Sequence, residues 1–170
     1  ACKEYYGNGE LLSEELKNEV LEQINKLEEM TGKKIEGEKP LLVSVRSGAP
    51  VSMPGMMDTI LNLGMNDKTA ENMVKIFENE NFVYDLYFRF IQMLYVLAQK
   101  LGYSCNEVDD ELRKKLKGRV SNQELINRAK IMYWEETGKF FPESAKEQLF
   151  MAINSIFKSW ENERAKVYRR

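Results

Sequence analysis

The stretch that most constrains the fold is residues 82–101, where 15 of 20 positions are apolar. Its length would allow a helix that spans a membrane. Asp85, Arg89, Gln92 and Gln99 lie within it, and each would be costly to place in lipid. We therefore expect a central helix that is buried on several faces, with Asp85 and Arg89 paired across one helical turn.

Helical patterns precede and follow this segment. Ser13 is placed to cap a helix that runs to about Met30, with apolar residues three or four positions apart. Another helix is expected after Asn66. Three boxes of the form Ser-x-x-Glu predict further helix starts, and three glycines predict helix ends, one that closes the central helix and two between the boxes. The boxes are Ser104–Glu107, Ser121–Glu124 and Ser144–Glu147, and the glycines are Gly102, Gly118 and Gly138. The chain is predicted to be mainly α-helical.

Residues 41–64 have a different character. The run 41–46 is typical of a short strand, and residues 57–62 are expected to form a second one. Between them, residues 47–57 contain two glycines and two prolines, which exclude regular helix. We expect a small β element here, and a division of the chain into 1–66 (an N-terminal helix plus this element) and a helical part, 67–170.

Charge and composition exclude several functions. The 170 residues carry a formal net charge of −2, which removes the electrostatic basis for a dedicated nucleic-acid-binding protein. Histidine is absent, so this chain holds no Ser-His-Asp triad, no zinc site with histidine ligands and no phosphohistidine. Cys2 and Cys105 form no motif, and we expect free thiols. A single disulfide between them is the alternative. No signal-peptide pattern opens the chain, so we expect a cytoplasmic protein without a membrane partner.

Arg46 is the main candidate for a binding residue. It ends the first predicted strand, and the small residues after it allow a ligand to come close. The planar guanidinium binds two phosphate oxygens at once, so a phosphate-contacting loop is one interpretation. No GxxxxGK[ST] or GxGxxG pattern supports it. The residues alone support a second interpretation equally well. In it, the segment is an ordinary β connection and Arg46 forms a structural ion pair.

A family resemblance distinguishes the two interpretations. The run LLVSVRSGAPVSMPGMMDTILNLGMND, residues 41–67, resembles the N-terminal nucleotide-binding region of the pyruvate, phosphate dikinase family. Residues 1–20, 133–157 and 159–170 resemble the same family in the same order. Enzymes similar to phosphoenolpyruvate synthase typically have VRSSA where this chain has VRSGA, so the dikinase is favoured and the synthase is the alternative.

The resemblance implies a fold and a function. It implies one or more helical subdomains of an ATP-grasp-like nucleotide-binding domain. The family converts ATP, pyruvate and phosphate to AMP, phosphoenolpyruvate and diphosphate, through a phosphohistidine on another domain. The resemblance assigns ATP-phosphate contact to Arg46 and second-rank contacts to Met57, Asp58 and Thr59, with no catalytic residue and no metal ligand in this chain. The implied partners are ATP with magnesium, the other domains of the parent enzyme, and a second copy in a parent homodimer.

Departures from the family pattern limit what the chain can do alone. The upstream GGKGA motif, the downstream residues that hold metal and nucleotide, and the carrier histidine are all missing from this sequence. We therefore expect magnesium ligands outside this chain and no dikinase activity from the chain alone. The alternative function is a helical interaction or structural module without nucleotide binding. Its candidate surface is Tyr133, Trp134, Phe140 and Phe141.

Overall fold

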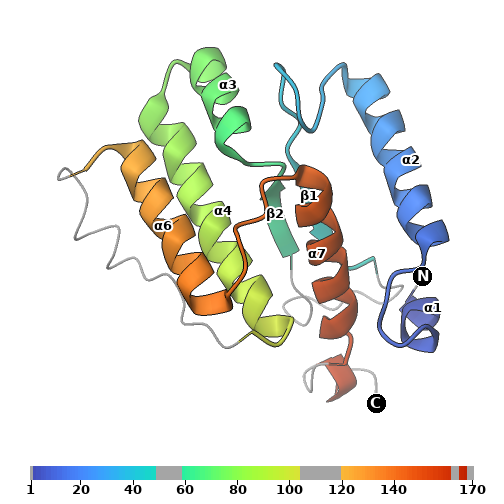
Figure 1. The fold of residues 1–170 in the computed structure, drawn as a ribbon. Coiled ribbons are helices and arrows are strands. Elements are labelled where there is room, and N and C mark those ends of the chain that lie inside the picture. The colour runs from blue at the N-terminus through green and yellow to red at the C-terminus, as the bar shows by residue number, and fades with distance from the viewer. Residues whose placement is uncertain (1, 49–58, 104–119, 162–164, 168–170) are drawn as a thin grey trace.

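The computed structural model describes residues 2–48, 59–103, 120–161 and 165–167 (Figure 1). These residues are mainly helical, with one two-stranded antiparallel sheet, as the sequence predicts. The elements are α1 (Cys2–Gly7), α2 (Glu14–Thr31), β1 (Val43–Arg46), β2 (Thr59–Leu63), α3 (Asp67–Phe77), α4 (Glu80–Lys100), α6 (Asn122–Thr137) and α7 (Ala145–Ser159).

Helix α4 is the centre of the packing. It contacts α3, α6, α7 and β2, and its buried residues form the largest share of the hydrophobic core. The predicted pair is present, with Arg89 Nε 3.0 Å from Asp85 Oδ2. None of the helices among the described residues combines the length and the apolar character needed to cross a membrane.

Helix α2 lies at the edge of the molecule (Figure 1). Its predicted start is confirmed, because Ser13 Oγ accepts the backbone N–H of Leu16 at 3.2 Å. No residue of α2 is fully buried, although Val20 and Ile24 pack against the core. Met30, at the end of the predicted apolar stripe, is exposed.

The caps of the other helices test the sequence patterns. Asn66 and Ser121 cap α3 and α6 as predicted. Ser144 precedes α7 but makes no side-chain cap hydrogen bond, so that part of the prediction is wrong. Glu36 Oε1 instead accepts the N–H of Ala145 at 2.5 Å, from 109 positions away in the sequence. The box Ser104–Glu107 and Gly118 lie outside the described residues, as does Cys105.

Helix α1 has no counterpart among the predicted elements. Tertiary contacts hold these six residues, since the Tyr5 ring packs 5.1 Å from that of Phe157 and the Tyr6 hydroxyl donates to the Phe157 carbonyl at 2.7 Å. An isolated helix this short is unstable in water, because one turn costs more conformational entropy than its hydrogen bonds return.

Candidate functional site

The β1–β2 hairpin carries the predicted binding residues. Helices α4 and α7 pack against it, and Figure 1 shows β2 between these two helices. Ile60 and Leu63 point inward and belong to the hydrophobic core, with Val43 and Val45 packed beside them. The opposite face of the hairpin therefore carries the remaining side chains, which include Arg46.

Arg46 and Thr59 lie side by side on this outer face. They are direct partners in the antiparallel register, so their side chains project from the same face with Cβ atoms about 5 Å apart. Both are exposed. Arg46 makes no hydrogen bond or ion pair with any other residue that the structure describes. The structural ion pair of the competing interpretation is not found among these residues.

A β-bulge produces this pairing. Val43 pairs with Leu63 but Val45 pairs with Ile60, so two residues of β2 stand opposite Ser44 alone. One of them, Asn62, has a φ of 59°, in the left-handed region. Without the extra residue the alternation along β2 would place Ile60 outward and Thr59 inward. The bulge therefore turns Thr59 to the face of Arg46 while Ile60 stays in the core.

Asn62 is a residue that the sequence analysis missed. The signal that could have found it is an asparagine inside a strand pattern, because asparagine is one of the few residues that adopts the left-handed conformation at low cost. Leu61, its neighbour in the bulge, is 48% exposed and gives the outer face an apolar margin.

Gln148 of α7 fixes the base of the hairpin. Its side chain is fully buried, and its Oε1 accepts the N–H of Gly64 at 2.9 Å. Its Nε2 donates to the carbonyls of Met65 at 2.9 Å and Pro142 at 2.8 Å. Gly64 has a φ of 102°, and a Cβ there would lie 3.2 Å from the Leu41 carbonyl oxygen. The end of β2 is thus held against both α7 and the segment before β1.

The structure describes only some of the other residues that the sequence analysis singled out. Met57 and Asp58 lie outside the described residues. Of the four aromatic residues of the alternative surface, Tyr133 and Phe141 are buried, whereas Trp134 and Phe140 are 48% and 84% exposed. The described parts of the chain contain no group of three or more acidic or cysteine side chains that could hold a metal ion.

Within strands β1 and β2, the outer face of the hairpin presents the Arg46 guanidinium and the hydroxyls of Ser44 and Thr59. A guanidinium beside hydroxyl donors is suited to bind an oxyanion such as a phosphate, since both groups donate hydrogen bonds. This arrangement can position and neutralise an anionic group.

Comparison with known proteins gives matches along the chain. Residues 8–170 match the family described as "Pyruvate phosphate dikinase, AMP/ATP-binding domain". The chain is 44% identical to the pyruvate, phosphate dikinase of Clostridium symbiosum over 180 residues, covering 100% of this chain and 21% of that protein. It is 39% identical to pyruvate, phosphate dikinase 2 of Zea mays, covering 99% of this chain and 20% of that protein.

A third relative is the pyruvate, phosphate dikinase of Giardia intestinalis, at 43% identity over 91% of this chain and 18% of that protein. The chain spans about a fifth of the length of these curated relatives. The family match runs through the hairpin and through every helix from α2 onward. On this basis, the chain belongs to the pyruvate phosphate dikinase AMP/ATP-binding domain family.

Proposed function

We propose that the outer face of the β1–β2 hairpin contacts the phosphates of ATP. The observation that carries this proposal is the pairing of Arg46 with Thr59 on one exposed face, with the Arg46 guanidinium unpartnered among the described residues. Membership of an AMP/ATP-binding domain family supports ATP as the ligand. Met57 and Asp58, which the resemblance also assigns to the nucleotide, precede Thr59 directly in the sequence.

Each side chain has a separate role in this contact. The guanidinium of Arg46 donates two parallel hydrogen bonds to phosphate oxygens and offsets their negative charge. The hydroxyl of Thr59 donates a further hydrogen bond from the neighbouring strand. Because Gln148 fixes the end of β2 to α7, the backbone that carries the two donors is held in place before the ligand arrives.

In the parent enzyme, this contact would hold ATP in a domain with an ATP-grasp-like fold. The reaction would convert ATP, pyruvate and phosphate to AMP, phosphoenolpyruvate and diphosphate, with the phosphoryl group carried by a histidine of another domain. The other domains, and a second copy in a homodimer, are the proposed partners. As the family resemblance implies, the magnesium ligands would lie outside this chain.

The chain alone should bind ATP weakly and show no dikinase activity. Removing a single electrostatic contact to a transition state typically costs about 10²–10³ in rate. One arginine and one hydroxyl do not replace the lysine, the metal and the metal ligands on which phosphoryl transfer depends. Binding and turnover are therefore separate measurements for this chain.

The test is a titration of the chain with Mg-ATP, followed by calorimetry. We expect a millimolar Kd, and Arg46→Ala should weaken binding at least about tenfold, because a hydrogen bond to a charged group is lost. Arg128→Ala is the matched control, since it removes one exposed arginine from α6, where Arg128 pairs with Glu124. Equal binding by wild type and Arg46→Ala, or no binding by folded wild-type chain, would contradict the proposal.

A further inference from the structure

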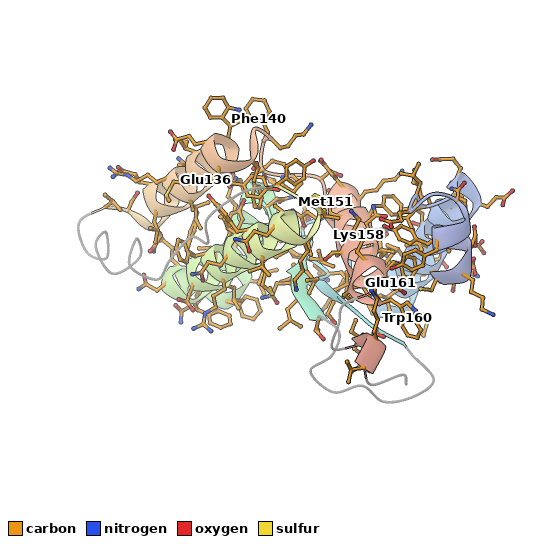
Figure 2. All side chains as sticks on the ribbon, turned by 90° about the horizontal axis from the view of Figure 1, so that it is seen from below. Glu136, Phe140, Met151, Lys158, Trp160 and Glu161 are labelled. Carbon is orange, nitrogen blue, oxygen red and sulfur yellow. The ribbon has the colours of Figure 1, made fainter. Side chains whose placement is uncertain are left out.

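A pocket of about 550 Å³ lies at the C-terminal part of α6 and the segment that follows it. Trp134 and Phe140 form its exposed walls, with ring planes 19° apart and centroids 6.4 Å apart. Figure 2 shows Phe140 at the outer edge of the molecule, pointing away from the helices. The pocket is lined by Lys130, Ile131, Trp134, Phe140, Phe141 and Glu143.

Lys130 at the base of the pocket is already fully engaged. Its side chain is 14% exposed, and its Nζ donates to Asp67 Oδ1 at 2.7 Å and to Glu143 Oε1. The same ammonium lies 5.2 Å from the ring centroids of both Tyr87 and Phe141, a cation–π geometry. Lys130 therefore has little capacity left for an anionic ligand.

The charge around Lys130 favours a second cation. Two carboxylates share one ammonium, so the three groups together carry a charge of −1. Burial raises the pKa of the Tyr87 hydroxyl, which stays protonated and donates a hydrogen bond to Asp67 Oδ1 at 3.0 Å. Glu143 is half exposed, and its Oε2 accepts no hydrogen bond from the described residues. One carboxylate oxygen at the pocket is thus open to a donor.

The exposed aromatic rings of the pocket favour a planar cation. Trp134 and Phe140 stack on each other, and neither has a cation over its ring among the described residues, whereas Lys130 lies over the rings of Tyr87 and Phe141. A planar guanidinium stacks on an aromatic face and donates to a carboxylate at the same time, which the compact ammonium of lysine cannot do as well.

We propose that this pocket binds an arginine side chain presented by a partner protein. The guanidinium stacks on an exposed outer face of the Trp134–Phe140 pair and donates to Glu143 Oε2. Covering Phe140, at 84% exposure, also removes apolar surface from water. Tryptophan and arginine are among the residues that contribute most to protein–protein binding, and such residues are typically found in well-packed pockets.

The test uses N-acetyl-arginine amide as the probe and the indole N–H signal of Trp134 in NMR spectra as the readout. The chain has two tryptophans, and Trp160→Phe assigns the two signals. We expect saturable shifts of the Trp134 signal with a Kd of roughly 1–10 mM, the level that one stacked, charge-assisted contact supplies. The neutral isostere N-acetyl-citrulline amide and N-acetyl-lysine amide should bind at least about fivefold more weakly.

Two variants locate the contact. Glu143→Gln should weaken probe binding about tenfold, and Glu147→Gln, the same change at an exposed carboxylate of α7 outside the pocket lining, should leave it unchanged. Phe140→Leu keeps an apolar residue at an exposed position and so leaves the fold intact, but it should weaken binding by removing a ring. Equal binding of the arginine, lysine and citrulline probes, or no effect of either pocket variant, would overturn the arginine site.

Discussion

The buried amide of Gln148 shows how one side chain can hold a binding surface in place. It makes three hydrogen bonds, to Gly64, Met65 and Pro142, and none of these groups is exposed. Gln148→Met keeps the volume but leaves one N–H and two carbonyls without their partner. We expect a loss of roughly 3–5 kcal/mol in the free energy of unfolding, because each buried unsatisfied group costs about 1–3 kcal/mol.

Urea denaturation at neutral pH measures this loss. Glu147→Gln, at the exposed neighbouring position, is the control and should change the free energy of unfolding by less than about 0.5 kcal/mol. A loss below about 1 kcal/mol in Gln148→Met would show that the amide is not an anchor of the hairpin.

The carboxyl of Glu28 makes the stability of the fold depend on pH. It accepts hydrogen bonds from Lys34 Nζ at 2.9 Å and from the Ile35 N–H at 2.8 Å, and these two contacts lower the pKa of its carboxyl in the folded chain. The unfolded chain therefore takes up this proton at a higher pH than the folded one. Stability from Glu28 is fully present above its ordinary value of 4.5 and is lost as the pH falls through the lowered folded pKa.

Glu28→Gln should accordingly be less stable than wild type at pH 7, and the difference should shrink as the pH falls from 5 toward about 3. Thermal unfolding of both proteins across this range measures it. Glu29→Gln, an exposed neighbour, should follow the wild-type curve. A difference between Glu28→Gln and wild type that is constant with pH would contradict the role of these two contacts.

The β2 strand depends on its bulge. Asn62→Gly keeps the positive φ at no steric cost and should preserve both stability and the pairing of Arg46 with Thr59. Asn62→Val places a β-branched residue in the left-handed region and should cost about 1–2 kcal/mol, or shift the register. NMR contacts between the Arg46 and Thr59 side chains report the register. Retention of both stability and these contacts in Asn62→Val would show that the bulge does not set the pairing.

Among the helices and strands, the sequence predicted the features that depend on residues close together in the chain. The caps at Ser13, Asn66 and Ser121 act over three residues and are confirmed. Features that depend on distant segments could not be read in this way. Glu36 replaces Ser144 as the partner of the α7 N-terminus across 109 positions, and α1 is held by Phe157.

The candidate site shows the same division. The Arg46 position at a strand end follows from the local pattern and the family resemblance, and the structure places it beside Thr59 on an exposed face. The bulge that brings the two together depends on the strand register. An alternating pattern alone does not fix that register to better than one residue. The aromatic surface was predicted as four residues, but burial divides it into a core pair and an exposed pair, Trp134 and Phe140.

For the whole molecule, the packing around α4 supports two separate surfaces. The hairpin rests on α4 and α7 and carries Arg46, whereas the pocket with Glu143 lies against α6. If ATP binds at the first surface and an arginine at the second, each ligand should bind when the other is present. The two surfaces share no lining residue, so a defect in one should leave the other intact.

The most direct test of the central claim is a map of backbone amide shifts in NMR spectra as Mg-ATP is added to the chain. We predict that, among the described residues, the largest shifts fall on residues 43–48 and 59–61, that Arg46→Ala removes them, and that α6 is unaffected. Saturable shifts centred on the pocket residues 130–143, with none on the hairpin, would contradict the assignment of the phosphate contact to Arg46.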